Sequence, residues 1–354
     1  ITTPAGNAPE LQSLVTTAAG PEDLIDRAEE VMRDDVPAQI EARRSAVAGA
    51  TWDARAAEVE AALGTRSEPD SDGRVTAVVV SFNTRALLER SLETLRGQAN
   101  VRLGTIVVDN ASADGSVEMV HERFPDVELI VLDENAGFGR ANNIAFERCT
   151  SEFVLLLNSD AFMAPGALAA MVTTAQQHPE AVAVGPRLLN EDGSLQRSAW
   201  PFPRAGRLLL EAVGLHLPLR RLGLLEDLGT WAHDEQRAVD FLVGACLLIR
   251  TAPLKEVNGF DERFWLYGEE ADLQKRLSAR GRSVVLTPAA EVTHVAGASS
   301  TEDVSRLRHF YAGQRRFLEH HGGPLAWPMG RLALLVGSLL RRRWAVVRLA
   351  IGIG

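Results

Sequence analysis

The sequence predicts an α/β protein with a mostly parallel sheet and helices on both of its faces. Short apolar runs alternate with amphipathic helical segments between residues 74 and 178. Each apolar run is continuous, as expected for a strand that is buried on both faces. Four of these runs end in small or polar residues, which would meet at one edge of the sheet. Open α/β sheets bind their ligands at that edge.

The expected elements follow one another in βα order. In chain order we expect a strand at 75–80, a helix at 84–98, a strand at 103–108, a helix at 116–124, a strand at 127–132, a helix at 139–149, a strand at 153–157 and a helix at 165–178. Helical crossovers join parallel strands, so this stretch predicts the parallel core of the sheet.

The pattern loosens after Ala181. A stretch rich in Pro, Arg and Leu, residues 186–234, is expected to form a partly helical insertion. Beyond it we expect a strand at 239–250, a helix at 273–280, a strand at 283–287 and a basic helix at 304–322. Four segments result: a helical segment at 1–65, a polar linker at 66–73, the main domain at 74–302 and a basic, apolar helical tail at 303–354.

Composition is that of an ordinary globular protein, with 46% hydrophobic and 24% charged residues among 354. The net charge of −10 argues against a dedicated nucleic-acid binder. Two cysteines, Cys149 and Cys246, are expected to be buried free thiols in a reducing cytoplasm. We find neither a secretory signal segment nor a long apolar run that would span a membrane, so we expect a cytoplasmic protein.

Positive charge is concentrated in the tail. From Val304 onward there are nine arginines and one acid, Glu319, a charge of +8, so the rest of the chain carries −18. Two interpretations are open. The tail could dock on anionic lipid at the inner face of the cell membrane, or it could form a packed helical hairpin decorated with arginines.

The polar loops after the first four strands predict a nucleotide pocket. Asp109 could accept a hydrogen bond from the imide of a pyrimidine base, and the loop amides and asparagines could bind ribose. Turn and helix-cap chemistry is the alternative for Asp109 and Asp114. The predicted donor-binding residues are Ser81, Asn83, Asp109, Asn110, Asn135, Gly137, Phe138, Asn142, Asn158 and Ser159.

Several common nucleotide and metal motifs are missing. Gly137-Phe138-Gly139 resembles a dinucleotide fingerprint, but the third glycine is replaced by Asn142 and the first strand lacks a glycine turn. Neither a Walker loop nor a His-Glu-x-x-His zinc helix is present. A nucleotidyltransferase would need a glycine-rich, basic loop after the first strand, where Ser81-Phe82-Asn83-Thr84 stands instead.

Asp160 and His294 are the candidate metal ligands. Mg²⁺ and Mn²⁺ prefer oxygen ligands, and diphosphate oxygens and water can fill most of their shell, so one or two protein ligands suffice. A lone histidine is more often a surface or capping residue, but His294 follows the last expected strand.

Three acids, Glu269, Glu270 and Asp272, stand just before the helix predicted at 273–280. Acids are common there because they complement the helix dipole. The aromatic residues Trp265 and Tyr267, which precede them, could form a platform for a sugar. Aromatic neighbours also raise the pKa of a carboxylate by desolvation, which suits a general base.

Together these motifs resemble glycosyltransferase family 2, most closely its rhamnosyltransferase-like branch. The similar stretches span residues 74–300: Val79-Val80-Ser81-Phe82-Asn83, Val107-Val108-Asp109-Asn110-Ala111-Ser112, Asn135-Ala136-Gly137-Phe138, Leu157-Asn158-Ser159-Asp160 and Tyr267-Gly268-Glu269-Glu270-Ala271-Asp272-Leu273. The resemblance implies a GT-A fold, a nucleotide-sugar donor, Mg²⁺ or Mn²⁺, and inversion at the anomeric carbon.

The same resemblance implies roles for individual residues. Asn158-Ser159-Asp160 stands where the family has its Asp-x-Asp motif, so Asp160 would hold the metal and Asn158 would face the nucleotide. His294 matches a family metal ligand. Glu270 falls at the catalytic base, where Asp is more usual, and both Glu270 and Asp272 stay open for that role.

The N-terminal residues 1–65 resemble the last helices of a GT-B glycosyltransferase of family 4, which implies a fusion of two transferases. The prediction for the whole chain is an inverting transferase that moves a sugar, with rhamnose favoured, to a glycan or lipid-linked acceptor. Glu269 and Asp272 would orient the acceptor or the base, and Trp265 and Tyr267 would stack on sugar. The alternative is a non-catalytic scaffold subunit that binds nucleotide sugars.

Overall fold

A computed structural model describes residues 74–222, 231–295 and 303–341, together with a few isolated positions near the N-terminus. The chain divides into two compact units, residues 1–70 and residues 71–354. The predicted N-terminal helices, the linker and the resemblance of residues 1–65 to a second transferase lie outside the described residues, apart from those isolated positions. The predicted division at residues 302 and 303 stays a prediction.

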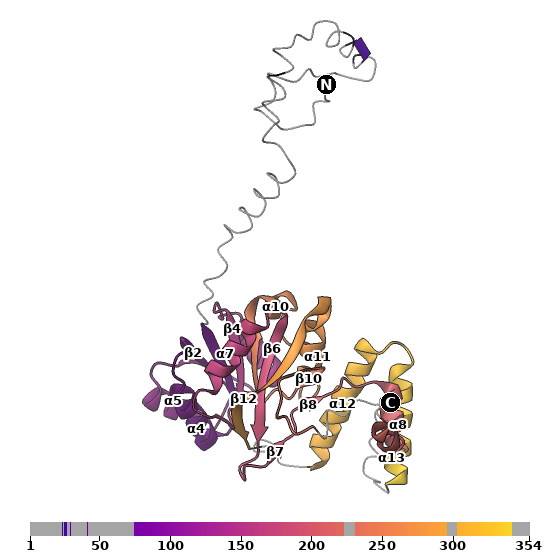
Figure 1. The fold of residues 1–354 in the computed structure, drawn as a ribbon. Helices are drawn as coiled ribbons and strands as arrows, with labels where there is room; N and C mark the ends of the chain where they lie inside the picture. Colours follow the sequence, from indigo (N-terminus) through magenta and orange to yellow (C-terminus); the bar gives the residue numbers. More distant parts are fainter. Residues whose placement is uncertain are drawn as a thin grey trace. The chain divides into compact units, whose positions relative to one another are not determined.

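A single large sheet forms the centre of the second unit (Figure 1). Its first four strands are parallel neighbours in the order β3-β2-β1-β4. Their bounds are β1 Val75–Ser81, β2 Leu103–Asp109, β3 Glu128–Val131 and β4 Phe153–Asn158. The predicted parallel core is therefore confirmed, and all four strands end in the predicted polar loops.

The second half of the sheet is mixed. β11 (Cys246–Arg250) runs antiparallel between β4 and β6 (Ala181–Leu189), and β6 pairs in parallel with β12 (Ser283–His294). β5 (Ala161–Met163) pairs antiparallel with the end of β12. The short strands are β7 (Leu195–Gln196) on β6, β9 (Arg237–Val239) on β12, and the separate pair β8 (Ala199–Trp200) and β10 (Phe241–Leu242).

Three strand predictions need correction. The single strand expected at 239–250 is divided into β9, β10 and β11, with Gly244 in the last gap. The loosened pattern after Ala181 hides β6, a nine-residue strand. β12 continues seven residues past Thr287, because Pro288 lies where the register shifts and no ladder hydrogen bond is required.

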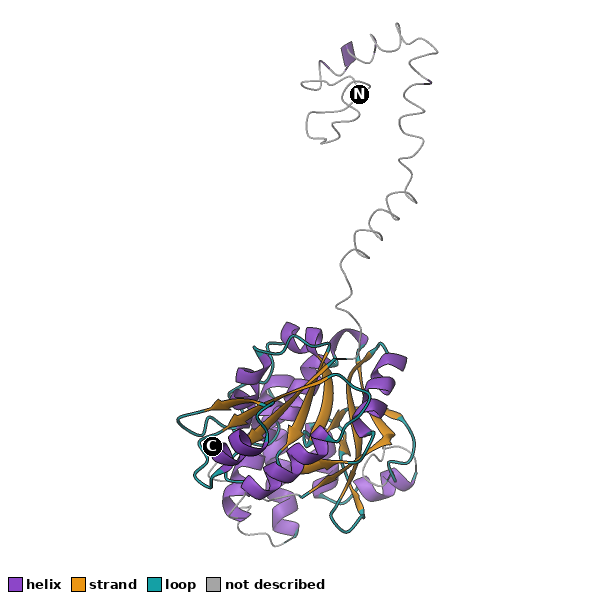
Figure 2. Cartoon of the chain, turned by 90° about the vertical axis from the view of Figure 1, so that its left-hand side faces the viewer, coloured by secondary structure: helices purple, strands orange, loops and turns teal. Residues whose placement is uncertain are grey.

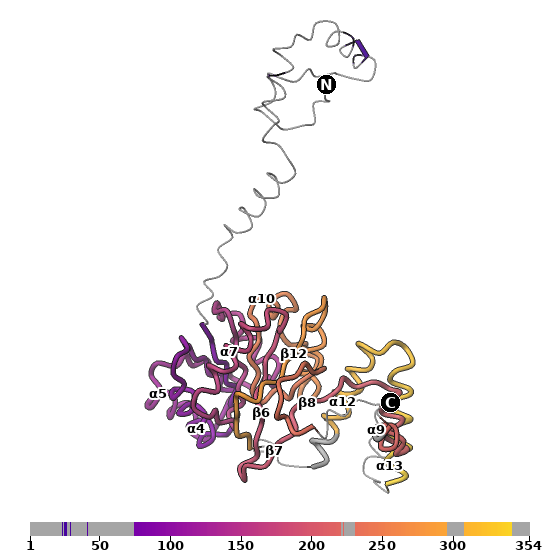
Figure 3. Tube along the Cα trace, in the orientation of Figure 1, coloured from indigo at the N-terminus to yellow at the C-terminus, as the bar shows by residue number. Residues whose placement is uncertain are grey.

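Helices cover both faces of the sheet (Figures 2 and 3). The side chains of α4 (Arg85–Arg96), α5 (Ser116–Arg123) and α7 (Ala167–Gln177) share one buried cluster with alternate strand residues such as Val79. Those of α6 (Phe138–Phe146), α10 (Thr251–Glu256) and α11 (Glu269–Leu277) pack with the other set, such as Val78. Cys149 and Cys246 are buried free thiols, and burial raises the pKa of Cys149 to about 11.

Four helices lie beside this sandwich. The insertion provides α8 (Ala205–Ala212) and α9 (His216–Arg221), and the C-terminal part provides α12 (Asp303–His321) and α13 (Ala326–Leu340). In Figure 1, α13 and α8 lie together, next to α12. The tail is thus a packed helical hairpin over its described part. None of the described helices combines the length and the apolarity needed to cross a bilayer.

Candidate active site

The loop after β1 is bonded to its neighbours through short polar side chains. Thr84 Oγ1 lies 3.0 Å from Ser81 Oγ and donates to Ser159 Oγ at 2.9 Å. The Asn83 amide N–H donates to Ser112 Oγ at 2.9 Å. Strand ends that are distant in sequence are therefore held in one rigid group of loops.

Asp109, at the end of β2, is buried and only half satisfied. One carboxylate oxygen, Oδ1, accepts a hydrogen bond from the Ser112 amide at 2.8 Å. The other, Oδ2, is buried without a partner among the described residues. A buried, unpaired carboxylate oxygen costs free energy unless a ligand supplies a donor, so the turn explains one oxygen of Asp109 and leaves the other for a ligand.

Asp114 is a capping residue, as the alternative interpretation expected. Its carboxylate accepts hydrogen bonds from the amide N–H groups of Arg85 and Ser116, at 2.8 and 3.1 Å. Burial acts to raise the pKa of Asp114, but bonds from the Ser116 hydroxyl and these two amides outweigh it and lower that pKa below its ordinary value. This side chain therefore fixes the loops and offers no oxygen that a ligand would need to satisfy.

The loop after β3 is held by paired asparagines. Asn110 Nδ2 donates to Asn135 Oδ1 at 2.9 Å, and Asn110 Oδ1 accepts from the Ala136 amide at 2.8 Å. Gly137 has φ +80°, and a Cβ there would lie 3.2 Å from the Trp265 ring. A glycine is therefore required at this close approach.

Two predicted donor residues of α6 have internal partners. Asn142 is buried, and its Nδ2 donates to the Phe138 carbonyl at 2.9 Å. The Phe138 ring meets Phe260 edge to face, with centroids 5.7 Å apart. Asn142 and Phe138 are therefore in contact with other residues of the protein. The donor-binding role predicted for them stays a prediction.

Asp160 and His294 lie side by side. His294 Nε2 is 3.3 Å from Asp160 Oδ1 and 3.4 Å from Asn158 Nδ2. The backbone explains the meeting, because the antiparallel pairing of β5 with β12 places His294 opposite Ala161, and the Val295 amide donates to the Asp160 carbonyl. The pairing of β5 with β12 thus brings together Asp160 and His294, which are more than a hundred residues apart in sequence.

Gln196, on β7, sets the orientation of His294. Its Nε2 donates to the His294 carbonyl at 3.1 Å and to Asn190 Oδ1 at 2.9 Å, so its Oε1 must accept from His294 Nδ1, at 2.7 Å. We infer that the proton is on Nδ1, which leaves a lone pair on Nε2 facing the Asp160 carboxylate. Two such electron-pair donors 3.3 Å apart suit a divalent cation.

The first turn of α11 carries two acids without a cationic partner among the described residues. Glu269 is buried, and its Oε2 has no hydrogen-bond partner in the part of the chain that the structure describes. Glu270 is half-buried, and its Oε2 accepts from the Gly268 amide at 3.2 Å. Desolvation raises the pKa of both carboxyls above the ordinary value, and the charge of Glu270 raises that of Glu269 further.

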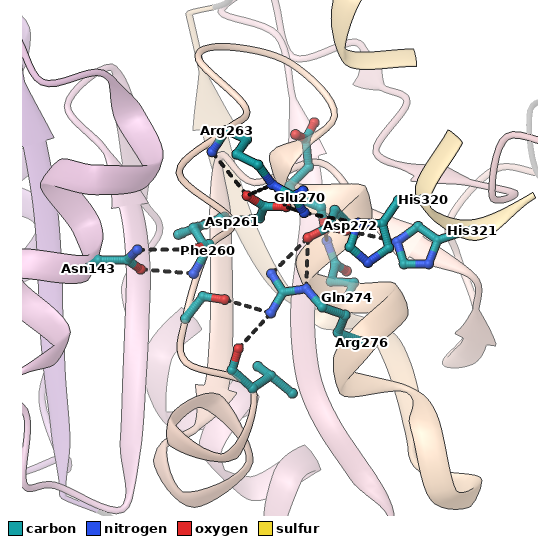
Figure 4. A network of polar contacts seen from close by, with 12 residues as sticks. Asn143, Phe260, Asp261, Arg263, Glu270, Asp272, Gln274, Arg276, His320 and His321 are labelled. Atoms are coloured by element: carbon teal, nitrogen blue, oxygen red, sulfur yellow. Dashed lines mark hydrogen bonds and ion pairs between the residues drawn. The ribbon is translucent and has the colours of Figure 1, made fainter. Parts of the chain in front are cut away.

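Asp272 has the opposite environment (Figure 4). It is fully buried, with Oδ2 bonded to the Arg276 guanidinium at 2.8 Å and Oδ1 2.8 Å from His321 Nε2 on α12. Burial acts to raise its pKa, but these partners outweigh it and lower the pKa below the ordinary value. Arg276 also donates to the carbonyls of Val257 and Gly259, both at 2.8 Å. Asp272 thus ties α11 to α12 and to the preceding loop.

Asp272, His320 and His321 also form a possible set of metal ligands, with one atom of each within 4.8 Å of the others. Because the Arg276 guanidinium already neutralises the Asp272 carboxylate, this set fits a cation less well than Asp160 and His294 do.

The acids of α11 and the Asn158-Ser159-Asp160 loop share one edge of the sheet. A Cβ on Gly244 would lie 3.4 Å from Glu270 Cβ, so Glu270 packs directly on that glycine. The next residue, Ala245, accepts a hydrogen bond from the Asn158 amide at 2.9 Å through its carbonyl. Gly244 and Ala245, the two residues before β11, therefore connect the first turn of α11 with the end of β4.

The aromatic run before α11 is divided between core and surface. Phe264 is buried, whereas Trp265 is half exposed and lies against Gly137 of the β3 loop. Tyr267 has φ +69°, and its ring meets Phe310 of α12 edge to face at 6.2 Å. Trp265 therefore borders the loop after β3, while Tyr267 is covered on one side by α12.

A mostly parallel sheet with this arrangement of polar loops, a neighbouring aspartate and histidine, and buried acids is that of a nucleotide-sugar transferase with the GT-A fold. The sequence profile of glycosyl transferase family 2 matches residues 76–213, and a profile described as the N-terminal domain of galactosyltransferase matches residues 233–301.

Similar curated proteins support this class. An N-acetylglucosaminyl-diphospho-decaprenol L-rhamnosyltransferase of Mycobacterium tuberculosis is 32% identical over 75% of this chain and 94% of that protein. An O-antigen biosynthesis protein of Myxococcus xanthus is 29% identical over 70% of this chain, but over only 20% of its own length. The chain therefore belongs to glycosyltransferase family 2, and it is an enzyme that transfers sugars.

The fold also has a counterpart among solved structures. GalNAc-T7, crystallised with UDP, GalNAc and Mn²⁺, superposes with a TM-score of 0.51 over 71% of this chain and 48% of that one, at 14% identity. At this identity the similarity concerns the fold alone.

Sequence reasoning missed the residues that support the site. Gln196, Arg276 and His321 act through a neighbour and belong to no motif of their own. Gly244 interrupts the apolar run predicted as a strand at 239–250. A glycine within a strand can mark a site of close approach, and here Glu270 packs on it.

Proposed function

We propose that this protein is an inverting transferase that moves rhamnose from a deoxythymidine-diphosphate donor to a hydroxyl of a lipid-linked glycan. The observation that carries the proposal is the common edge that Asp160, His294 and Glu270 share through Gly244 and Ala245. The rhamnosyltransferase at 32% identity supports the choice of sugar.

Donor recognition would depend on the loops of the first three strands. The unpaired Asp109 Oδ2 is suited to accept a hydrogen bond from the imide N–H of thymine or uracil. The bonds among Ser81, Asn83 and Ser159 and their neighbours fix these loops before the donor arrives, so little ordering is lost on binding. Asn158 and Ser159 would then face the nucleotide.

The residues present fit a divalent cation, Mg²⁺ or Mn²⁺. Asp160 would supply a carboxylate oxygen and His294 an imidazole nitrogen, and diphosphate oxygens would complete the shell. When bound, the ion would neutralise the charge that develops on the departing nucleoside diphosphate.

Glu270 is the proposed general base. Its carboxylate would take the proton of the acceptor hydroxyl while that oxygen bonds to the anomeric carbon from the face opposite the diphosphate, whose bond to that carbon breaks. Asp272 is a poorer candidate because both of its oxygens are engaged by Arg276 and His321. The raised pKa of Glu270 brings its proton affinity closer to that of a base at neutral pH. Glu269 and Asp272 would position it, and Trp265 and Tyr267 would contact sugar.

The acceptor is proposed by analogy with the mycobacterial relative, whose name specifies a polyprenyl-diphosphate sugar. Such an acceptor is anchored in a membrane, so the transferase would act at its cytoplasmic face. This places the basic tail near anionic lipid.

The test is turnover of a panel of thymidine-, uridine- and guanosine-diphosphate sugars with Mn²⁺ or a chelator. We expect metal-dependent transfer or hydrolysis with thymidine-diphosphate rhamnose preferred, and a product of inverted anomeric configuration by NMR. Asp109→Asn should weaken binding of pyrimidine donors by about tenfold, the loss of one charge-assisted hydrogen bond. Donor binding without any turnover would instead support a scaffold subunit.

A further inference from the structure

Helix α13 has an inverted distribution of side chains. Its buried face consists of small residues: Ala326, Gly330, Ala333, Gly337 and Ser338, next to Trp327. Its outer face consists of large apolar ones: Leu325, Met329, Leu332, Leu339 and Leu340, each between 40% and 70% exposed. In water a helix normally buries its large apolar side chains and exposes polar ones.

The small residues are needed where α13 approaches its neighbours. A Cβ on Gly330 would lie 2.6 Å from Leu318 of α12, and a Cβ on Gly337 would lie 3.2 Å from Ala212 of α8. The inner face of α13 is thus already used inside the molecule. Helices that pack through small residues and turn bulky apolar ones outward are typical of a lipid environment.

The insertion that packs on α13 also exposes apolar side chains. The Arg341 guanidinium donates to the Glu211 carbonyl at 2.9 Å and so holds the end of α13 against the end of α8. The turn that follows α8 exposes Val213 and Leu215, and α9 exposes Leu217. We call the outer side of α13 together with these three residues the C-terminal apolar face, and Figure 3 shows α9 and α13 on one side of the molecule.

Charge identifies the occupant of this face. Within the described residues 322–341 there are two arginines, Arg331 and Arg341, and no acid, whereas the whole chain carries −10. Residues 204–222 add four arginines against the single acid Glu211. A second copy of the chain docked on the same face would bring these positive charges together, whereas an anionic bilayer would neutralise them.

We propose that the C-terminal apolar face inserts into the surface of an anionic lipid bilayer. The 15 residues of α13 span roughly 22 Å, short of the roughly 30 Å hydrocarbon core, so the helix lies in the interface and does not cross it. The proposal rests on the proposed function in one respect, because a lipid-linked acceptor gives the enzyme a reason to be there.

The face is also linked to the acids of α11. α12 packs against α13 and bonds Asp272 through His321. A Cβ on Gly313 of α12 would collide with the Tyr267 carbonyl, so the helix backbone lies directly on the segment that leads into α11. Binding at the face would therefore fix the side of the site where the acceptor is expected.

The experiment is co-sedimentation of the full chain with phosphatidylglycerol vesicles and with phosphatidylcholine vesicles. We expect binding to phosphatidylglycerol that weakens with salt, and weak binding to phosphatidylcholine. The variant Leu332→Asn/Leu339→Asn should bind at least about tenfold more weakly, because each exposed leucine loses the transfer energy of one buried side chain. The control Val131→Asn alters an equally exposed apolar residue on β3 and should bind like the wild type.

Metal-dependent donor hydrolysis is measured in the same samples. If the double variant hydrolyses the donor at the wild-type rate, the variant is folded, and its weaker vesicle binding is a direct effect on membrane contact. Absent vesicle binding with normal hydrolysis would overturn the membrane proposal alone, and absent hydrolysis with normal vesicle binding would overturn the proposed function alone. Light scattering that finds a dimer in the wild type and a monomer in the double variant would assign the face to a second copy and also overturn the proposal.

Discussion

The donor loops and the first turn of α11 meet at one edge of the sheet, but their polar groups are treated in opposite ways. In the loops after β1 to β3, hydrogen bonds such as those of Asn110 with Asn135 and Ala136 engage side chains with one another, and Asp109 Oδ2 is an exception that has no partner among the described residues. In α11, Glu269 and Glu270 stand next to each other with no cation among the described residues to pair them. The first arrangement fixes the shape of the loops, whereas the second leaves two carboxylates without a cationic partner, as the proposed general base requires.

The contrast is repeated within α11 itself. Asp272 lies one turn from Glu269 and is equally buried, yet a guanidinium and an imidazole engage both of its oxygens. Its pKa is lowered where those of the two glutamates are raised. Burial alone therefore does not decide the chemistry of a carboxylate, because its partners do.

Replacing Glu270 should have the largest effect of the variants considered and tests whether an unpaired acid of α11 is the base. Glu270→Gln keeps the size of the side chain and its bond from Gly268 but removes the proton acceptor. We expect kcat to fall by about 10²–10⁴-fold with donor binding unchanged, as is usual for the loss of a general base. Steady-state kinetics and nucleotide titration measure the two quantities, with Glu147→Gln on the exposed surface as the control. A loss below about tenfold would assign the base to another residue.

Removing the Asp272 carboxylate should affect stability instead. Asp272→Ala leaves the Arg276 charge buried without its partner, so we expect the free energy of unfolding to fall by about 3–5 kcal/mol. Urea unfolding measures it. The matched control is Asp261→Ala, which removes a carboxylate from the exposed Arg263 and should cost no more than about 1 kcal/mol. Equal losses in the two variants would contradict the structural role of Asp272.

Gln196 tests whether the orientation of His294, a proposed metal ligand, is fixed in advance. Gln196→Ala removes the acceptor that holds the His294 proton on Nδ1, so the Nε2 lone pair is no longer directed at Asp160. We expect Mn²⁺ affinity to fall by about 10–100-fold, as for other residues that orient a ligand. The Mn²⁺ dependence of donor hydrolysis measures this, and Gln176→Ala on the exposed side of α7 is the control. Unchanged Mn²⁺ dependence would remove His294 from the metal site.

The strands and the contacts of the site differ in how well they could be predicted from the sequence. The strands β1 to β4 and their polar ends could be predicted because each is a local run of apolar residues with a local stop. Asp160 and His294 could be proposed as partners, but their meeting depends on β12 continuing past Pro288, which no local pattern indicates. Gln196 and His321 could not be found, because each matters only through a hydrogen bond to a residue about a hundred and about fifty positions away.

The smallest expected effect is the opposite pH dependence of the two carboxylate environments. The pKa of Glu269 is raised on folding, so the folded state holds the extra proton and stability falls as pH rises between the ordinary value, about 4.3, and the raised one. Glu269→Gln should therefore gain stability over the wild type as pH rises through that window. The pKa of Asp272 is lowered, so its contribution is present above about 3.9 and is lost as pH falls through the lowered value.

At acidic pH both variants should be close to the wild type in stability. As the pH rises, Asp272→Asn should become less stable than the wild type, whereas Glu269→Gln should become more stable than the wild type. Each unit of pKa shift corresponds to about 1.4 kcal/mol, so urea unfolding at several pH values resolves both effects. If both variants differ from the wild type in the same direction at neutral pH, the partners of one of the two carboxylates have been wrongly assigned. The contrast between a paired and an unpaired carboxylate within one helical turn would then no longer explain which of them can accept a proton.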